Sequence, residues 1–328
     1  MARKIILDVD TGIDDALAIA YALGSPELEL IGITGTYGNV LVPTGTRNAL
    51  AILELFGRSD VPVFAGPDHA RERDSFEVLD ISKFIHGENG IGEAVIPDAA
   101  RGVEERSAVD FMVESVREYG DDLVIVPVGP LTTVAAAMEA DPEFAERAHI
   151  INMGGALTVP GNVTPWAEAN INQDPEAADM VFRNAADITM IGLDVTLQTL
   201  LTREETAKWE ALGTTGGDFL AAATNYYIGA YDEIAPYLGG CGLHDPLAAA
   251  VAVDPTLVTT LDINLKTDTE GETRGRTIGD ETRLNNAEKT AHVAVGVDVA
   301  RFLAEFMRRL TSLAASTPSS LGEGGSLH

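Results

Sequence analysis

The segment that decides the fold covers residues 5–16 and has the sequence IILDVDTGIDDA. Its apolar, β-branched beginning is typical of a buried strand. Its second half, from Gly12 onward, has the small and acidic residues found at the start of a helix. Four carboxylates lie within eight residues around this junction: Asp8, Asp10, Asp14 and Asp15. The segment therefore predicts a strand that leads directly into a helix, with negative charge concentrated between them.

Outward from this segment, short β-branched runs alternate with amphipathic helical stretches. That order favours one α/β domain with an open, mostly parallel sheet and helices on both faces, a Rossmann-like arrangement. The expected strands are residues 4–8, 28–35, 61–65, 123–128, 149–153 and 188–193. The expected helices are residues 14–23, 44–56, 107–119, 131–140 and 175–184, with Ser107 capping the third.

The rest of the chain has a weaker pattern. Residues 68–106 form a polar stretch with little periodicity, which is typical of a functional or disordered loop. The last third is expected to be helical up to residue 253, antiparallel over residues 257–278, and helical again over residues 298–313. We therefore expect a single domain over residues 1–313. The Ser/Gly-rich residues 314–328 are expected to be a disordered tail.

The formal net charge of −29 argues against a nucleic-acid partner, because phosphate binding needs clustered Lys and Arg. No apolar run approaches the roughly 18 residues of a membrane span. The N-terminus lacks a signal peptide's apolar region, so we expect a cytoplasmic protein. Cys241 is the only cysteine, which rules out an intrachain disulfide and fits a reducing compartment.

The basic residues are unevenly divided, with 17 Arg against 5 Lys. An acidic, lysine-poor surface fits a protein that works in high salt, where screening removes self-repulsion. It fits an ordinary acidic cytoplasmic protein equally well. Stability measured against salt concentration separates the two interpretations.

The aspartate cluster after the first strand needs compensation. Two unit charges about 4 Å apart at a protein surface repel by roughly 4 kcal/mol, and no Lys or Arg lies within residues 5–16. A helix N-terminus favours an anion by only about 0.3–1 kcal/mol. A bound cation would cancel the remainder, and an all-oxygen site favours Ca²⁺ or Mg²⁺ over zinc. The alternative is that these residues only cap a helix on a solvated surface.

Two other acidic motifs were compared with this segment. An EF-hand loop would need an acid at Gly12 and a glutamate near Ile19, so it is excluded. A haloacid-dehalogenase-type phosphatase would have Thr or Val at the position of Gly12, and would need a lysine that acts on phosphate. That alternative is weakened but stays open.

The pattern Asp-x-Asp-x-Gly-x-Asp-Asp, which ends at Asp15, closely resembles the signature of the inosine–uridine nucleoside hydrolase family. Further matches follow in the family's order and at its approximate spacing. They are Asn39 after the second strand, IHGENG at residues 85–90, NMGG at 152–155, the stretch from Gly161 to Asn170, and His244-Asp245-Pro246. Each match is weak alone, whereas the combination is highly specific.

The resemblance implies a calcium-dependent enzyme that cuts the N-glycosidic bond of a ribonucleoside with water. It implies Ca²⁺ held by Asp10, Asp15, Asp245 and the carbonyl of Val128, with Asp10 as the base and His244 as the acid. It also implies a set of substrate-binding residues: Asp14, Asn39, His86, Met153, Asn162, Glu168, Asn170, Tyr227 and Tyr231. Relatives are commonly homodimers or homotetramers. The strand pattern supports this layout, because ligands of open α/β sheets bind beyond the carboxyl ends of strands.

Simpler roles remain open for several of these residues. The three asparagines suit turns, His244 suits a helix start, His86 suits a loop, and the two tyrosines, spaced i and i+4 on one helix face, suit core packing. Ala169 stands where relatives commonly have an aromatic residue, so the base preference is open. A nucleoside- or sugar-binding module without activity is the remaining alternative, and an assay for ribose release separates it from an enzyme.

Overall fold

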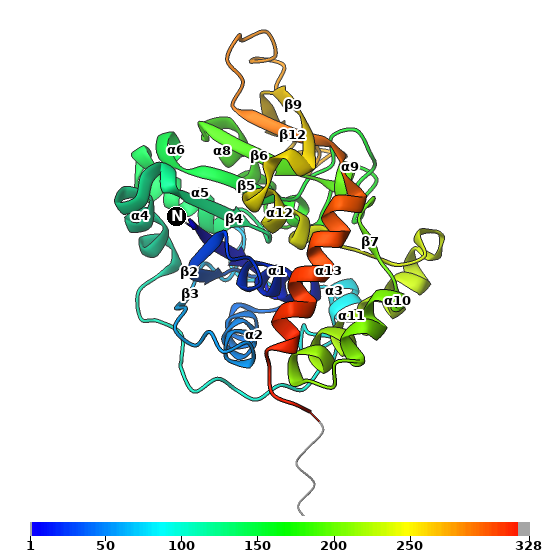
Figure 1. Ribbon diagram of the computed structural model, residues 1–328. Helices are drawn as coiled ribbons and strands as arrows, with labels where there is room; N and C mark the ends of the chain where they lie inside the picture. Colours follow the sequence, from blue (N-terminus) through cyan, green and yellow to red (C-terminus); the bar gives the residue numbers. More distant parts are fainter. Residues whose placement is uncertain (1, 321–328) are drawn as a thin grey trace, which may run out of the picture.

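The central feature of the computed structural model is an 8-stranded sheet in the order β3-β2-β1-β4-β5-β6-β12-β9, with helices on both faces (Figure 1). The structure describes residues 2–320. All neighbouring strands are parallel except β12 and β9. The single-domain α/β architecture predicted from the sequence is confirmed. None of the described helices is long and apolar enough to span a membrane.

The strands of the main sheet are, in chain order, β1 (Arg3–Val9), β2 (Leu28–Gly35), β3 (Val63–Ala65), β4 (Leu123–Pro127), β5 (His149–Met153), β6 (Asp187–Ile191), β9 (Val258–Ile263) and β12 (Ala291–Val297). β1 pairs with β2 on one side and with β4 on the other. The chain winds outward from β1 to β3 and then crosses to β4, so the winding reverses between β1 and β4. Ligands of such sheets bind at this switch point, beyond the carboxyl ends of the strands.

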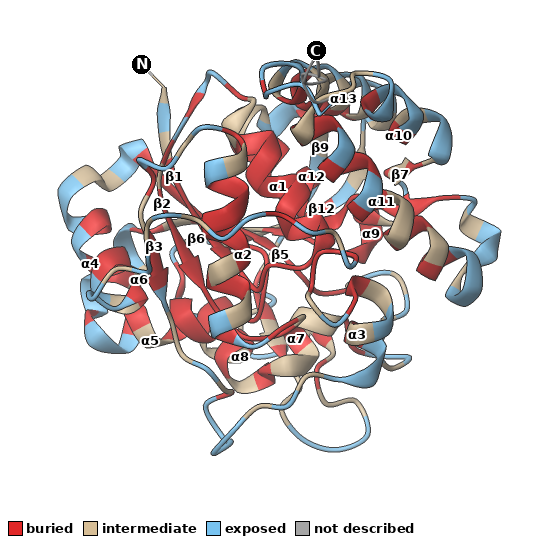
Figure 2. Cartoon of the chain, turned by 90° about the horizontal axis from the view of Figure 1, so that it is seen from below, coloured by how far each residue is buried: buried red, intermediate tan, exposed pale blue. Residues whose placement is uncertain are grey.

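Two hydrophobic cores cover the two faces of the sheet. Alternate residues of β1 point to opposite faces, so Leu7 belongs to one core and Ile6 to the other. The first core includes residues of α1 (Ile13–Leu23), α2 (Val42–Leu55), α11 (Thr215–Ile234), α12 (His244–Val253) and α13 (Val299–Ala315). The second includes residues of α4 (Ala108–Tyr119), α5 (Thr132–Ala140), α6 (Pro142–Arg147) and α8 (Pro175–Asn184). Figure 2 shows that buried residues fill the sheet and the inward helix faces.

Shorter elements complete the chain. The short helices are α3 (Asp80–His86), α7 (Ala169–Gln173), α9 (Leu193–Thr196) and α10 (Arg203–Glu210), with 3₁₀ turns at Gly120–Asp122, Pro236–Leu238 and Pro255–Leu257. Two small antiparallel sheets pair β7 (Leu200–Leu201) with β8 (Cys241–Gly242) and β10 (Leu265–Thr267) with β11 (Thr277–Gly279).

Several elements were not expected from the sequence, among them the short α6, α7, β7 and β8 and the two that follow. Helix α3 lies inside the stretch 68–106 that was expected to be a loop; its apolar Ile81 and Phe84 are largely exposed, so they give no core-facing periodicity. Strand β12 was not expected, because Ala and Gly weaken its β-branched pattern, and its pairing with β6 and β9 fixes it as a strand. The strand expected at 188–193 ends at Ile191, because Leu193 begins α9.

The C-terminal boundary also differs in detail. The last helix continues past residue 313 to Ala315. Beyond it, the Gly216 N–H donates to the Thr317 hydroxyl and the Thr215 N–H donates to the Pro318 carbonyl, both at 2.9 Å. The first part of the expected tail 314–328 is therefore held against the start of α11. Residues 321–328 of that tail lie outside the described residues.

Candidate active site

The predicted site residues gather at the switch point of the sheet. Asp10 directly follows β1, Val128 directly follows β4, and Asn39 lies in the loop after β2. A β-carbon added to Gly129 would lie 3.1 Å from Asp10 Oδ1, so the ends of β1 and β4 are in close contact. Met153 ends the neighbouring strand β5. The carboxyl edge of the sheet thus brings together residues that are far apart in the sequence.

Three buried carboxylates form the centre of the site. Oxygen atoms of Asp14, Asp15 and Asp245 all lie within 4.8 Å of one another. Asp14 and Asp15 are in the first turn of α1, and Asp245 is in the first turn of α12, which packs beside α1. Asp10 is 1% exposed and adjoins this group, because its backbone N–H donates to Asp15 Oδ1 at 3.0 Å.

The raised pKa values of these carboxylates indicate that the cluster needs a positive charge. Burial and then the negative charge of Asp15 raise the pKa of Asp14 to about 8. Burial also raises the pKa values of Asp10 and Asp245 well above the ordinary range, with the neighbouring aspartates adding to the effect. Within residues 2–320, no Lys or Arg forms an ion pair with these four aspartates, and Asp10 Oδ1 and Asp14 Oδ1 are buried without a hydrogen bond. Hard oxygen donors in this state fit a divalent cation.

Two glycines let the backbone approach the carboxylates. The Asp15 carboxylate accepts from the Gly12 N–H at 2.8 Å, and a β-carbon on Gly12 would lie 2.6 Å from the His86 ring. Gly38 has a φ of +155° and comes so close to Asp10 that a β-carbon would lie 2.0 Å from Oδ2. The next backbone N–H, that of Asn39, donates to the same oxygen at 2.6 Å. Side chains at these two glycines would therefore displace the site residues.

The residues expected to hold the ribose lie around the carboxylates. The Asn39 side-chain amide donates to Asp15 Oδ2 at 3.3 Å. The Asn170 side-chain amide donates to the Val128 carbonyl at 2.8 Å and to the Met153 carbonyl at 3.2 Å. Asn170 therefore joins the ends of β4 and β5. These contacts place both asparagines as hydrogen-bonding residues of the site rather than simple turn residues.

The next two predicted ribose ligands are partly engaged elsewhere. The Glu168 carboxylate is buried and caps α7, accepting from the backbone N–H groups of Gly155, Asn170 and Ile171 at 2.9–3.2 Å. Asn162 is exposed, and its side-chain oxygen accepts from the Ala169 N–H at 3.0 Å. Asn162 thus lies at the rim of the site, and Glu168 lies inside it.

His86 ends helix α3 and borders the carboxylates from the other side. Its Nδ1 accepts from the Ile13 N–H at 3.1 Å, so the ring proton belongs on Nε2. Its Nδ1 also lies 3.9 Å from Asp14 Oδ1. Burial, with a smaller effect of His244, lowers the pKa of His86 to about 3. The ring is therefore neutral at physiological pH and can donate one hydrogen bond from Nε2.

A chain of tyrosine and histidine side chains runs away from Asp14. The Tyr227 hydroxyl donates to Asp14 Oδ2 at 3.4 Å, and its ring packs edge to face on Tyr231, with centroids 5.0 Å apart. The Tyr231 hydroxyl is 2.7 Å from His244 Nε2, and His244 Nδ1 is 2.8 Å from the Thr196 hydroxyl. The predicted one-sided placement of the two tyrosines on a helix is confirmed.

The contacts of this Tyr–His chain correct the expectation about the pKa of His244 and identify one further residue, Thr196. The acid role of His244 was linked to a pKa near neutrality, whereas burial lowers the pKa to about 4, so the ring is neutral at pH 7. Thr196 was not identified in the sequence, and it orients His244 from the short helix α9. A lone threonine gives no sequence signal for such a role. The compact group of three carboxylates also includes Asp14, which was expected to bind only the sugar.

Comparison with known proteins agrees with this geometry. The family model for "Inosine-uridine preferring nucleoside hydrolase" matches residues 5–304. A solved structure, "Purine-Preferring Ribonucleoside Hydrolase from Gardnerella vaginalis", is 64% identical, with a TM-score of 0.94, covering 95% of this chain and 99% of that one. The chain is 38% identical to "Probable uridine nucleosidase 2" of Arabidopsis thaliana, covering 94% of this chain and 97% of the relative. It is 36% identical to a pyrimidine-specific ribonucleoside hydrolase of Escherichia fergusonii, with 94% and 99% covered.

These likenesses extend over nearly the whole chain, and the matched residues 5–304 span the strand ends, the aspartate cluster and the late His-Asp-Pro segment. They give no support to the phosphatase alternative. The family model and the relatives match this chain over the full domain and not over one motif alone. The chain belongs to the inosine-uridine preferring nucleoside hydrolase family.

Proposed function

We propose that this protein hydrolyses the N-glycosidic bond of ribonucleosides, releasing ribose and the free base. The observation that carries the proposal is the group of three buried carboxylates at the switch point, with Asp10 beside it and a Tyr–His pair within reach of its edge. The named relatives, which are nucleosidases and ribonucleoside hydrolases, support the same activity. The substrate is a small molecule, and the net charge of −29 argues against a nucleic acid.

The cofactor that we propose is Ca²⁺, held by Asp10, Asp15, Asp245 and the Val128 carbonyl. Asp14 belongs to the same cluster and can share in the binding. All these donors are oxygens, and carboxylates with a backbone carbonyl are the ligands that Ca²⁺ prefers. When bound, a divalent cation supplies positive charge that lowers the pKa of water and holds vicinal hydroxyls.

We assign the proton-accepting role to Asp10. Its Oδ2 is held by the Asn39 N–H, while Oδ1 is buried without a hydrogen bond and is available to take the proton of the attacking water. The cleavage develops positive charge on the ribosyl ring, as in other glycoside hydrolyses. The surrounding carboxylates stabilise that charge by fixed electrostatics.

The remaining polar residues would orient the sugar. We propose that Asp14, Asn39 and Asn170 bind the 2′- and 3′-hydroxyls, because they lie next to the carboxylate group. Glu168 and, from the rim, Asn162 would bind the 5′-hydroxyl. Met153 would pack below the ring, where its sulfur already lies 3.4 Å from the Asn170 amide.

For the leaving base, we propose that His244 acts together with Tyr231. The Tyr231 hydroxyl can give its proton to the departing base, while the Nε2–H of the neutral imidazole keeps its proton and donates a hydrogen bond to the tyrosine oxygen across the 2.7 Å contact. The proton that Asp10 takes from the attacking water can later restore the tyrosine hydroxyl through solvent. Thr196 would hold the imidazole in place, and Tyr227 and His86 would border the base. A cytoplasmic location and a homodimeric or homotetrameric state remain predictions.

The first prediction concerns the carboxylate cluster. Asp10→Asn keeps the shape of the side chain but cannot accept a proton, so kcat for inosine should fall by at least about 100-fold. A chelator should abolish ribose release by the wild-type protein, and added Ca²⁺ should restore it. Asp74→Asn, an exposed acid without a side-chain hydrogen bond among the described residues, is the matched control and should retain full activity. Chelator-insensitive release would exclude the metal-dependent mechanism.

The second prediction concerns the leaving group. His244→Ala should lower kcat/KM for inosine by about 100-fold or more, because the base then departs without a proton. The same variant should lose less than about tenfold on p-nitrophenyl riboside, whose leaving group needs no acid. Tyr231→Phe should show the same selectivity if the two side chains act together. Equal losses on both substrates would remove His244 and Tyr231 from the acid role.

The third prediction concerns pH and the cation. Without a cation, the folded chain keeps a proton on Asp14 that the unfolded chain loses above about pH 4, since the folded pKa is about 8. Folding therefore takes up protons between these values, and the cation-free protein loses this contribution to stability as pH rises. A cation that replaces the proton should raise Tm more at pH 8 than at pH 5.5, by thermal unfolding with Ca²⁺ or chelator. In Asp245→Asn, the rise in Tm caused by Ca²⁺ should be the same at pH 8 and at pH 5.5. If the rise is still larger at pH 8, the effect comes from Ca²⁺ bound elsewhere on the surface.

The fourth prediction concerns the base. We propose that inosine is preferred over uridine, because the 64% identical relative is named as purine-preferring, whereas relatives named for uridine or pyrimidines are 36–38% identical. The ratio of kcat/KM for inosine to that for uridine should be at least about tenfold, the discrimination that one changed pocket contact can give. A ratio below one would reject the purine assignment and leave the hydrolase itself intact.

A further inference from the structure

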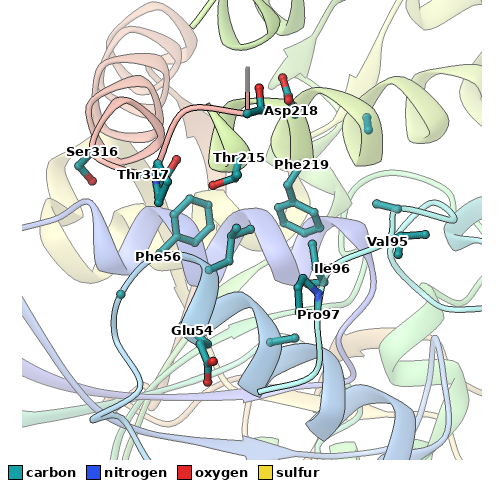
Figure 3. A pocket seen from close by; sticks show the side chains of 17 residues that line it. Glu54, Phe56, Val95, Ile96, Pro97, Thr215, Asp218, Phe219, Ser316 and Thr317 are labelled. Carbon is teal, nitrogen blue, oxygen red and sulfur yellow. The ribbon is translucent and has the colours of Figure 1, made fainter. Parts of the chain in front are cut away.

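A cavity of about 720 Å³ lies outside the active site (Figure 3). Its walls are the end of α2, residues 94–97, the first half of α11 and the C-terminal residues 316–320. None of the carboxylates or of the Tyr–His residues lines it. Its volume falls within the range of pockets that hold a small organic molecule, which is about 300–1,000 Å³.

The interior of this cavity is mainly apolar. Figure 3 shows the rings of Phe56 and Phe219 projecting into it near Ile96 and Pro97. Val95 lies at its edge and is 95% exposed, which is unusual for a β-branched apolar residue. A ligand with an apolar or aromatic body would remove this surface from water and gain the hydrophobic contribution.

The charged residues that line the cavity favour a ligand with a positive charge. Glu54 and Asp218 are the ionisable residues that line the cavity, and Figure 3 shows them at opposite ends of the apolar floor. The Glu54 carboxylate accepts one hydrogen bond, from the Ala100 N–H, and keeps one oxygen free. Within residues 2–320, the Asp218 side chain has no hydrogen-bond or ion-pair partner. Two unneutralised carboxylates in a chain of net charge −29 favour a cation.

The N-terminus of α11 also meets this cavity and would by itself favour an anion. The backbone N–H groups of its first turn, however, already donate hydrogen bonds within the protein. Thr215 donates to Pro318, Gly216 to Thr317, and Gly217 and Asp218 to Thr214. The half charge of the helix dipole is smaller than the two full charges of the carboxylates. An anionic ligand is therefore excluded by both the hydrogen bonds and the charge.

We propose that this cavity binds an organic cation, a molecule with an apolar or aromatic body that carries an ammonium group. The body lies between Phe56 and Phe219, where a cation near the rings is also attracted to their faces. The ammonium group pairs with Asp218 or Glu54. Binding of this cation does not depend on the reaction at the carboxylate cluster.

The cavity is connected to the active site through its own walls. The segment that contains Val95 begins at His86, and the Gly92 N–H donates to the His86 carbonyl at 2.7 Å. Gly92 packs on α11, since a β-carbon there would lie 2.9 Å from Tyr226 Cβ. A ligand between residues 94–97 and Phe219 therefore restrains the two elements that present His86 and Tyr227. Restraint before binding reduces the entropy lost on binding, so KM for the nucleoside falls.

The test uses three probes of similar size: 3-phenylpropylammonium, 3-phenylpropanol and 3-phenylpropanoate. Binding to the full-length protein is measured by calorimetry and by ligand-observed NMR. The ammonium probe should bind best and the carboxylate probe at least about tenfold more weakly. Asp218→Asn and Glu54→Gln should each weaken the ammonium probe about two- to fivefold. Ala222→Leu, which fills the cavity from an exposed position on α11, should abolish binding. Glu210→Gln, an exposed acid outside the cavity, is the control and should change nothing.

Equal affinity for the three probes, or unchanged affinity in Ala222→Leu, would overturn the proposal. Suppose that none of the probes binds and that light scattering shows a dimer, which Val95→Lys dissociates. The cavity would then be a contact between subunits instead. The effect on KM rests on the proposed nucleoside hydrolysis, whereas binding does not. A nucleoside KM that stays the same under saturating ammonium probe would overturn the coupling, and failure of hydrolysis itself would leave the binding result standing.

Discussion

The constraint on which the rest of the structure depends is the mutual repulsion of buried aspartates that have no Lys or Arg partner among the described residues. Asp10, Asp14, Asp15 and Asp245 are nearly or fully buried, and burial raises the pKa of each of them. A protein can keep such a group only if protons or a cation neutralise it. The surrounding backbone is arranged to hold the carboxylates in spite of this cost. Gly12 and Gly38 admit the close contacts, and the backbone N–H groups of Gly12 and Asn39 donate to two of the carboxylates.

The topology explains why these residues meet. Because the winding reverses between β1 and β4, the loops after these two strands lead away from each other at the switch point of the sheet. Asp10 follows β1, whereas Asp14, Asp15 and Asp245 lie at helix N-termini, where the peptide dipoles favour negative charge by about 0.3–1 kcal/mol each. The Tyr–His pair comes from α11 and α12. The carboxylates of α1 and α12 and the Tyr–His pair of α11 and α12 are therefore presented by helices that pack on the same face of the sheet.

Several regular elements were predictable because their patterns are local. The strand over Leu28–Gly35 and the helix over Pro175–Asn184 agree to the residue, since each has clear boundaries and periodicity. Strand β12 depends on pairing with distant strands, and the buried residues of α3 are the polar Ser82 and His86, so neither element has a local apolar signature. The family resemblance implied a set of site residues, and the structure brings Asp14, Asp15 and Asp245 of that set together. It could not show that Glu168 caps a helix, that Thr196 holds His244, or that burial makes both histidines neutral.

The position of Asp245 has a consequence for biosynthesis. The first carboxylates leave the ribosome with β1, but the partner that completes the group of three follows more than two hundred residues later. A nascent or truncated chain that stops before α12 lacks Asp245, one of the four proposed cation ligands. Tight binding of the proposed cation would therefore require that α12 has docked on α1. Occupancy of the centre would then report that the domain has finished folding, and incomplete chains would be unable to degrade cellular nucleosides.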